Sequence, residues 1–454
     1  MYLMGIDIGT TTISIVLLDG ESGTLTGKKT VEHCAFCRGE WPESRIQDPA
    51  KIWRLTRCAV QELTETYGRP YGIGLTGQMH GMLYVDVLGE AVSPLYTWQD
   101  GCGNLPLKNG RTSAEFLKEH AGYAASGYGI TTHYYLQQNN RIPKEAVKMT
   151  TISDYIAMKL TGSQEPVIAA DMAAGWGCFD LQKHEFCMDA LRAAGVDISY
   201  LPRTCKEHGI VGRTAQGIPV ICSLGDNQAS VIGSVQSLED SVLINVGTGS
   251  QVSMGSSKYV QCGGNIELRP CLSGHYIMVG AGLCGGRAYA MLEQFYREAS
   301  GVSSANLYDR MLCQAQKFLE EYGKDRAWKI HTAFSGTREN PRECGSMGEI
   351  RAENFHPGAM TAGMLLGILE ELHQYYKEMC KVTGRHAVHL VGSGNGLRKN
   401  MLMRRLAEEM FGLPLKVTAC EEEAACGAAL CAMTAVGAAA SIEDAQRKIV
   451  YITD

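Results

Sequence analysis

The chain opens with the residues Leu3-Met4-Gly5-Ile6-Asp7-Ile8-Gly9-Thr10-Thr11-Thr12-Ile13-Ser14-Ile15-Val16-Leu17-Leu18-Asp19. This stretch predicts a β-strand, a tight polar turn and a second β-strand. Asp7 interrupts the first apolar run, although Asp is disfavoured inside strands, and Gly9 lets the backbone turn tightly. Successive N–H groups in a turn form a concave site for anions. The stretch indicates either a phosphate turn with a carboxylate that suits Mg²⁺, or an ordinary hairpin with a capping Asp.

The same layout returns in the second half of the chain, as Val242-Leu243-Ile244-Asn245-Val246-Gly247-Thr248-Gly249-Ser250-Gln251-Val252-Ser253-Met254. Asn245 occupies the place that Asp7 has in the first copy. Two such hairpins indicate an internal duplication, with one copy opening each domain. We therefore expect an N-terminal domain over residues 1–236 and a C-terminal domain over residues 237–454.

Local patterns predict single elements. Asp48 as N-cap and Pro49 at the first helical position begin a helix. A helix is also predicted around Thr112–His120, and an amphipathic helix over residues 361–382 that Gly384 ends. The small residues from Ala169 to Gly177 predict a loop with close backbone approach.

Composition limits the partners of the protein. Its 454 residues favour two or three domains. A net charge of −6 argues against nucleic acid or an anionic membrane as the main partner, and no apolar run is long enough to span a bilayer. We see no signal peptide and expect a cytoplasmic protein. The 17 cysteines include a single CxxC, Cys34 and Cys37, without the second pair that a metal site would need. We expect most cysteines to be small buried hydrophobes.

Two short segments of the first half have the composition of a sugar site. Gln78, Met79 and His80 follow a predicted strand, and Gln and His can both donate and accept hydrogen bonds. Trp98 offers an apolar plate and Asp100 accepts hydrogen bonds from hydroxyl groups, as in a mainly apolar pocket with a few polar groups. Taken singly, the first segment is better explained by a loop histidine with satisfied hydrogen bonds, and the second is also compatible with a turn that carries a core Trp.

Asp226 follows a predicted strand and turn and begins an apolar helix. It is an N-cap candidate, and the helix dipole favours the carboxylate form that a general base needs.

Two glycine-rich turns lie in the second half. Gly280, Gly282 and Gly285 spell a dinucleotide fingerprint, but no acidic strand end follows at the expected spacing. Gly392 and Gly394 lie in a strand-to-helix turn that suits an adenine or ribose face, because backbone can approach closely there.

Taken together, the segments Gly5–Thr11, Gly77–Gly81, Thr97–Gly101, Leu224–Ser230 and Asn245–Ser250 resemble the FGGY family of carbohydrate kinases. The resemblance covers nearly the whole chain in the right order. It implies an α/β fold of two RNase H-like domains, of the actin and hexokinase type, with an interdomain active-site cleft. It also implies ATP and Mg²⁺ as cofactors and phosphoryl transfer to a terminal hydroxyl of a ketose. Sedoheptulose is the first candidate and xylulose or another pentulose the alternative.

The resemblance also implies residue roles. Asp226 would be the general base, and Asp7 would be a second catalytic residue that holds the metal beside the phosphates. The phosphates and the rest of the nucleotide would be bound by Thr10, Thr11, Thr12, Gly247, Thr248, Gly286, Gly392, Gly394 and Asn395. The sugar would contact Gln78, Met79, His80, Trp98, Asp100 and Asp226.

The chain departs from the family at Cys102, where members often carry Arg, and over the polar residues 104–150. The alternatives are an actin-like or chaperone-type ATPase, which would not explain the Gln78 and Trp98 segments, and a nucleotide-binding oxidoreductase, which rests only on the glycine fingerprint that begins at Gly280. The sequence leaves open the preferred ketose and whether the chain forms a homodimer.

Overall fold

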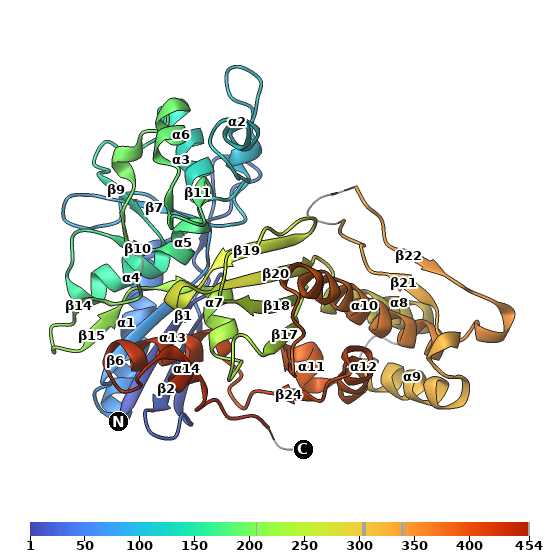
Figure 1. Cartoon of the computed structure of the whole chain (residues 1–454). Helices are drawn as coiled ribbons and strands as arrows, with labels where there is room; N and C mark the ends of the chain where they lie inside the picture. The colour runs from blue at the N-terminus through green and yellow to red at the C-terminus, as the bar shows by residue number, and fades with distance from the viewer. Residues whose placement is uncertain (206, 302–305, 337–339, 341, 453–454) are drawn as a thin grey trace. The chain divides into compact units, whose positions relative to one another are not determined.

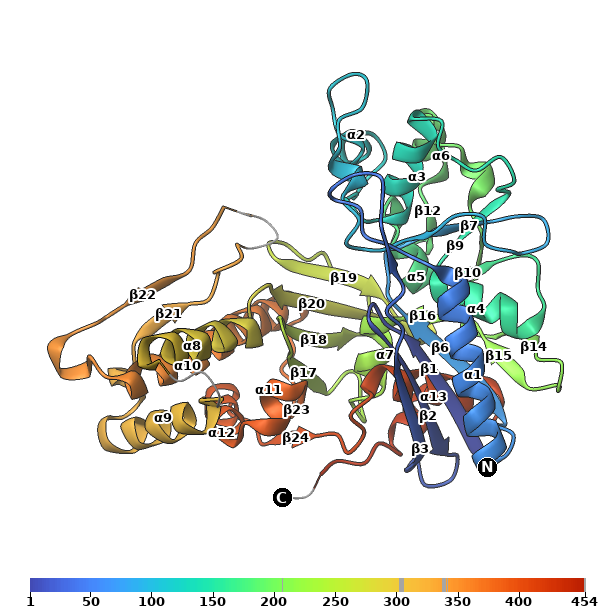
Figure 2. The same ribbon diagram turned by 180° about the vertical axis from the view of Figure 1, so that it is seen from behind.

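The computed structural model describes residues 1–205, 207–301, 306–336, 340 and 342–452. The chain divides into two compact units. The first unit comprises residues 1–236, 269–275 and 422–450, and the second comprises residues 237–268, 276–421 and the end of the chain. The first break in the chain falls after Gln236, and two later segments return to the first unit. Each unit has a sheet of its own (Figures 1 and 2).

The first sheet is built around the predicted hairpin. Its strands follow the order β14-β15-β6-β1-β2-β3, and β16 also pairs with β6. The strands β1, β2 and β3 form an antiparallel meander, and β6 runs parallel to β1. The bounds are β1 (Tyr2–Ile8), β2 (Thr12–Asp19), β3 (Leu25–Glu32), β6 (Gly72–Gly77), β14 (Ile210–Arg213), β15 (Pro219–Ile221) and β16 (Leu224–Gly225).

Helices cover both faces of this sheet. On one face, Met4, Ile6 and Ile8 pack into a core with residues of α1 (Pro49–Tyr67) and α4 (Ile152–Thr161). The predicted start of α1 is confirmed, because the Asp48 side chain caps it by accepting the N–H groups of the first turn. On the other face lie α13 (Glu423–Ala435) and α7 (Asp226–Ile232), which pack against each other (Figure 1).

Two glycines permit the close approach of α13 to the sheet. A Cβ atom on Gly5 would lie 1.8 Å from the carbonyl oxygen of Ala425, and one on Gly74 would lie 1.8 Å from that of Ala428. Since no side chain fits there, both positions require glycine. Gly5 and Asp7 are two residues apart in β1, so both lie on the face that is turned toward α13. The helix α13 therefore begins close to the predicted phosphate turn.

A second core of the first unit surrounds the buried Trp176. It is built by small elements, including much of the region 104–150 that the sequence left unassigned. The predicted helix near Thr112 is α2, which Thr112 caps. The segment after Ala169 forms the short helix α5, where we expected a loop. The bounds are β4 (Phe36–Cys37), β5 (Ile46–Gln47), β7 (Leu83–Val85), β8 (Leu95–Tyr96), α2 (Ser113–His120), α3 (Gly129–Gln138), β9 (Lys148–Thr150), β10 (Val167–Ala169), α5 (Ala170–Ala174), β11 (Phe179–Asp180), β12 (Glu185–Phe186), α6 (Met188–Ala193) and β13 (Arg203–Cys205).

The second sheet has the order β19-β20-β18-β17-β23-β24. Its core is completed by the long amphipathic helix α10 (Pro357–Thr383), which ends at the left-handed Gly384 as predicted. The bounds of the strands are β17 (Ser241–Val246), β18 (Ser250–Ser256), β19 (Ile266–Pro270), β20 (Tyr276–Gly282), β23 (His389–Ser393) and β24 (Leu415–Val417). A separate ribbon joins β21 (Lys329–His331) to β22 (Ser346–Gly348), and the other main helices are α8 (Gly286–Ser300), α9 (Tyr308–Tyr322), α11 (Asn395–Lys399) and α12 (Met401–Phe411).

The two sheets repeat one pattern. In the first, β3-β2-β1 is antiparallel and β6 is parallel to β1; in the second, β20-β18-β17 is antiparallel and β23 is parallel to β17. This repeat agrees with the duplication that the two hairpins indicated. It also excludes a dinucleotide-binding unit at Gly280, because β20 is antiparallel to its neighbour β18, whereas that fingerprint requires a parallel βαβ unit.

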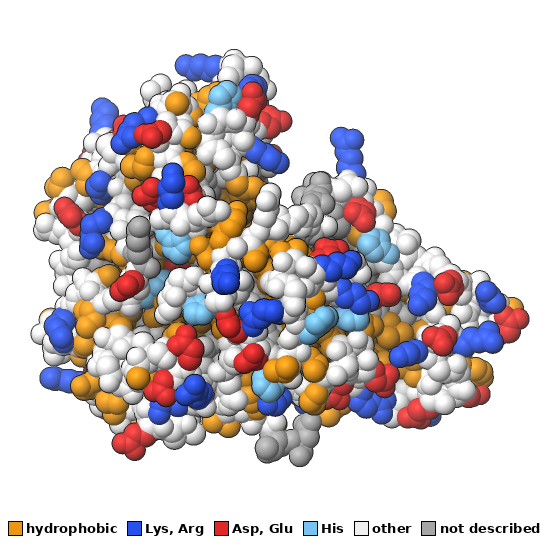
Figure 3. Space-filling model, viewed as in Figure 1, with side chains coloured by type: hydrophobic (Ala, Val, Ile, Leu, Met, Phe, Trp, Pro, Cys, Tyr) orange, Lys and Arg blue, Asp and Glu red, His pale blue; other side chains and the backbone are white. Residues whose placement is uncertain are grey.

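The surface is mixed in charge. On the face drawn in Figure 3, basic and acidic side chains are interspersed over both units. Among the helices that the structure describes, none has the length and apolarity needed to cross a bilayer.

Candidate active site

Asp7 lies one residue before the end of β1. It pairs in register with Ser14 of β2, and Ser14 pairs with Thr30 of β3. Thr30 donates to a carboxylate oxygen of Glu422 at 3.1 Å. Burial, Asp226 and Glu422 raise the pKa of Asp7 to about 7. Neighbouring carboxylates that oppose ionisation mark a place where a cation would be stabilising.

The donor set near Asp7 fits a cation that comes with a phosphate. The Oδ1 atom of Asp7 is buried and has no hydrogen-bond partner among the described residues. No group of three His, Cys, Asp or Glu side chains in the described part of the chain is arranged to hold a metal ion by itself. The unpartnered oxygen of Asp7 suits Mg²⁺, which is usually held by one or two carboxylates together with substrate phosphates and water.

Hydrogen bonds from His33 fix the backbone of the turn after β1. His33 accepts the N–H of Ala35 at Nδ1 (3.2 Å), so its Nε2–H donates to the carbonyl of Gly9 (3.2 Å). The backbone N–H of His33 donates to the carbonyl of Thr11. Burial lowers the pKa of His33, which keeps the ring neutral. With its carbonyls tied back, the turn presents the side chain of Thr11 to solvent.

The loop after β6 holds the predicted sugar residues in an unusual backbone conformation. His80 has φ of 73°, which is uncommon outside glycine. Its ring stacks on Tyr128 at a centroid distance of 4.3 Å, and its Nδ1 hydrogen-bonds to the carbonyl of Gly175. Trp176 donates to the carbonyl of Gly81 at 3.0 Å. Non-glycine residues in this region of φ cluster at functional sites and persist where the surroundings fix them.

Asp226 is the first residue of α7, and Gly225, not Asp226, is the N-cap. Its Oδ1 accepts the N–H of Asn227 at 2.7 Å, and the backbone N–H of Met79 also hydrogen-bonds to the carboxylate. Burial raises the pKa of Asp226, while Arg269 and these N–H groups oppose that shift. The bond from Met79 ties the candidate base to the predicted sugar loop.

Trp98 and Asp100 have different environments, although they are two residues apart. Trp98 is 47% exposed and donates its indole N–H to the Thr10 hydroxyl at 3.0 Å. Asp100 is buried, and its two oxygens accept the backbone N–H groups of Cys102 (3.0 Å) and Arg45 (2.9 Å). Trp98 is therefore available as a plate beside the turn, whereas Asp100 organises its own loop.

Cys102, where family members often carry Arg, is fully buried. Burial and the adjacent Asp100 raise the pKa of its thiol. The side chain at this position is therefore part of the core of the first unit.

The second unit contains a cavity of about 920 Å³ around the second hairpin. Six of the residues that line it were singled out in the sequence analysis: Asn245, Gly247, Thr248, Gly286, Gly394 and Asn395. A Cβ atom on Gly286 would lie 2.2 Å from the carbonyl oxygen of Gly247, and Gly394 has φ of 80°. Gly392 does not lie in the turn where we predicted it, because it pairs inside β23 with the neighbours β17 and β24.

Sequence reasoning missed other walls of this cavity, among them Arg287, Tyr289, Tyr308, Asp309 and Lys399. The rings of Tyr289 and Tyr308 lie 5.4 Å apart, and the Tyr289 hydroxyl is buried without a partner among the described residues. Of these five residues, only Arg287 is adjacent in sequence to a motif that the sequence analysis had recognised, the Gly285-Gly286 turn.

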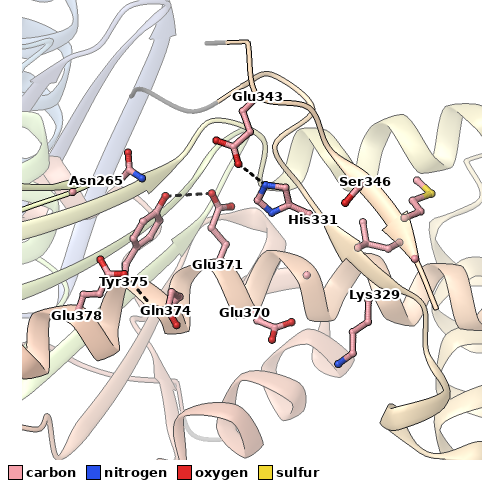
Figure 4. Close-up of a pocket in the computed structure, with 15 residues that line it drawn as sticks. Asn265, Lys329, His331, Glu343, Ser346, Glu370, Glu371, Gln374, Tyr375 and Glu378 are labelled. Carbon is pink, nitrogen blue, oxygen red and sulfur yellow. Dashed lines mark hydrogen bonds and ion pairs between the residues drawn. The ribbon is translucent and has the colours of Figure 1, made fainter. Parts of the chain in front are cut away.

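A second cavity of the same unit, of about 630 Å³, is poorly suited to a nucleotide (Figure 4). Glu343, Glu370, Glu371 and Glu378 line it, and Figure 4 shows Glu343 paired with His331 and Glu371 bonded to Tyr375. These carboxylates would repel phosphates, so the cavity at the hairpin is the better candidate.

Comparison with known proteins identifies the family. Residues 2–233 match the model of the N-terminal domain of the FGGY family of carbohydrate kinases, and residues 242–436 match the model of its C-terminal domain. The chain therefore belongs to the FGGY family of carbohydrate kinases, and the predicted α/β fold of two domains is confirmed.

Particular relatives extend this result. Sedoheptulokinase from Mus musculus is 28% identical over 94% of this chain and 96% of its own length. Xylulose kinase from Escherichia coli (strain K12) is 26% identical over 55% of this chain and 53% of its own length. The crystal structure of gluconate kinase from Lactobacillus acidophilus shares the fold, with a TM-score of 0.85 and 19% identity over 100% of this chain and 92% of that chain.

Proposed function

We propose that this carbohydrate kinase transfers the γ-phosphoryl group of ATP to a terminal hydroxyl of a ketose, and that sedoheptulose is its preferred acceptor. The observation that carries the proposal is Asp226. Its carboxylate is partly exposed and has a raised pKa. The backbone N–H of Met79, in the loop that also carries His80, hydrogen-bonds to it. The similarity to sedoheptulokinase over nearly the full length supports sedoheptulose, with a pentulose such as xylulose as the alternative.

In the proposed mechanism, Asp226 accepts the proton of the attacking hydroxyl as the new P–O bond forms. A raised pKa makes this carboxylate a better base near neutral pH. The Thr10–Thr12 turn hydrogen-bonds to the phosphates and keeps the transferred group in line. Phosphoryl transfer depends mainly on such positioning and on charge stabilisation.

Asp7 would hold Mg²⁺, with Glu422 as the nearby second carboxylate that Thr30 orients. When bound, the ion would offset negative charge on the phosphates. Gly247, Thr248, Gly286, Gly394 and Asn395 would hold the nucleotide in the cavity of the second unit. This assigns the sugar and phosphates to the first unit, which includes Glu422, and the nucleotide to the second unit.

Sugar contact is proposed for Gln78, Met79, His80 and Trp98. For Asp100 we propose an indirect role, since its oxygens already hold the loop that carries Trp98. A cytoplasmic location and a homodimer stay predictions, and light scattering of the purified protein tests the second.

The test is ADP release from Mg·ATP in the presence of sedoheptulose, D-xylulose, D-ribulose, L-ribulose, D-fructose or glycerol. Strong stimulation by sedoheptulose supports the proposal. Stimulation by a pentulose alone would keep the kinase and replace the substrate. Steady hydrolysis that no sugar stimulates would favour the actin-like or chaperone-type ATPase.

A further inference from the structure

A chain of three amide and carbonyl groups runs through the interior of the first unit. Gln47 donates from Nε2 to the backbone carbonyl of Thr10 at 2.7 Å. Gln78 donates from Nε2 to Oε1 of Gln47 at 3.0 Å. Both glutamines are buried, with exposed fractions of 0% and 2%. The chain therefore links the phosphate turn, at Thr10, to the predicted sugar loop, at Gln78.

The direction of these hydrogen bonds follows from Thr10. A backbone carbonyl only accepts, so Gln47 must turn its NH₂ group toward Thr10 and its carbonyl toward Gln78. Gln78 must then donate to Gln47. Its own carbonyl oxygen, Oε1, is buried and has no hydrogen-bond partner among the described residues. A buried acceptor without a partner is unfavourable, so this atom is suited to a donor that comes with a ligand.

Gln47 itself is firmly anchored. It lies in β5, opposite Phe36 of β4 and Leu95 of β8. The next residue, Asp48, caps α1. Because the backbone of Gln47 is held on both sides, its side chain can fix the two groups that it bridges.

We propose that Gln47 is a positioning residue of the kinase reaction, which holds the Gln78 carbonyl ready to accept a hydrogen bond from a hydroxyl group of the ketose. Through the same amide, Gln47 holds the Thr10 carbonyl and with it the phosphate turn. The inference rests on the proposed function, since it assigns the Gln78 loop to the sugar. The inference adds Gln47, which lies outside the recognised motifs, to the proposed site. It also gives a reason why the ketose group that meets Gln78 must be a hydrogen-bond donor.

The variants Gln47→Leu and Gln78→Met test the proposal, singly and combined, with the ketose that best stimulates ADP release. Each single variant is expected to lower kcat/KM for the ketose by about tenfold, the size of one neutral hydrogen bond. Because Gln47→Leu already removes the bond between Gln47 and Gln78, adding Gln78→Met is expected to lower kcat/KM little further. Gln446→Leu is the matched control, since Gln446 is also a buried donor to backbone carbonyls of the first unit, and it should keep the wild-type kcat/KM.

A set of monodeoxy analogues of the same ketose separates positioning from a merely structural role. The wild type should disfavour one analogue by about tenfold, and Gln47→Leu should reduce this discrimination to less than about twofold. If Gln47→Leu does not fold, Gln78→Met carries the test, because it is close in size and leaves the bond from Gln47 to Thr10 in place. Retained discrimination in a less active variant, or additive losses in the double variant, would overturn the inference.

The two proposals fail in different ways. If no sugar stimulates the wild type, the proposed function is wrong and this inference falls with it. If the wild type is stimulated but both variants discriminate as it does, only the role of Gln47 is wrong.

Discussion

At the scale of single residues, the first unit uses buried polar side chains to fix backbone near the candidate site. His33 and Gln47 hold carbonyls of the phosphate turn. Asp171 accepts the N–H of Gly225, the residue directly before Asp226, at 2.9 Å. The other oxygen of Asp171 is paired with His208 at 3.0 Å. Each of these side chains fixes a peptide group whose neighbour has a proposed role in the reaction.

Asp226→Asn is expected to lower kcat by about 10²–10⁴-fold, because the amide cannot accept the hydroxyl proton. The KM for the ketose should change little, since shape and burial are kept. Steady-state kinetics with the best acceptor measures both. The exposed Asp189→Asn is the control and should match the wild type; near-normal turnover in Asp226→Asn would remove Asp226 from the role of base.

His133 makes a prediction about acid stability. It is buried between the hydroxyl of Tyr84 (2.6 Å) and the carbonyl of Asp197 (3.0 Å), and burial lowers its pKa to about 4. The unfolded chain, with an ordinary His pKa near 6.5, therefore binds the proton first. Its contribution to stability is complete above pH 6.5 and is lost as the pH falls toward 4, by about 3 kcal/mol. Urea unfolding at pH 7, 5 and 4 measures this loss.

His133→Gln should flatten this part of the pH dependence, although it is expected to be less stable at pH 7. The exposed His120→Gln should keep the wild-type dependence. Equal pH dependence in His133→Gln and the wild type would assign the acid sensitivity to other groups.

At the scale of elements, the predictable features were those with a local pattern. The two hairpins, the Asp48 cap and the Gly384 stop depend on neighbouring residues, and each lies where the sequence indicated. The helix α5 was missed because alanine and glycine carry no face, and Gly392 was assigned to a turn although it pairs inside β23. The side chains of Tyr289, Asp309 and Lys399 reach the nucleotide cavity from separate helices, which no single motif reveals.

The packing of α13 on β1 gives a prediction about an element. Gly5→Ala is expected to lower the free energy of unfolding by about 2–3 kcal/mol, because the new methyl group meets the backbone of α13 and only a shift of the helix relieves it. Thermal or urea unfolding measures the change. Gly209→Ala is the control from the same unit, because a Cβ atom there meets open space. Equal stability of the two variants would show that α13 moves without cost.

At the scale of the whole molecule, two units of like topology divide the proposed ligands between them. Hydrogen exchange can read each unit separately, because binding slows the local opening of the segments that contact a ligand. We expect MgADP to protect residues 247–249, 286–290 and 394–400 of the second unit. A stimulating ketose should protect residues 78–81 and the Trp98 loop of the first unit. Protection of the Glu371 cavity in place of the hairpin cavity by MgADP would contradict the assignment.

The order in which the chain is synthesised has a consequence for α13. This helix covers β1 and β6, yet it comes more than 340 residues after the end of β6 in the sequence. While the ribosome is still making the second unit, the first sheet is complete in its strands but lacks α13 on the face with Gly5 and Gly74, where only α7 is already present. The nascent protein therefore carries an incompletely covered sheet while the residues between β16 and α13 are made, and a chaperone that shields such a surface would raise the yield of correctly folded enzyme.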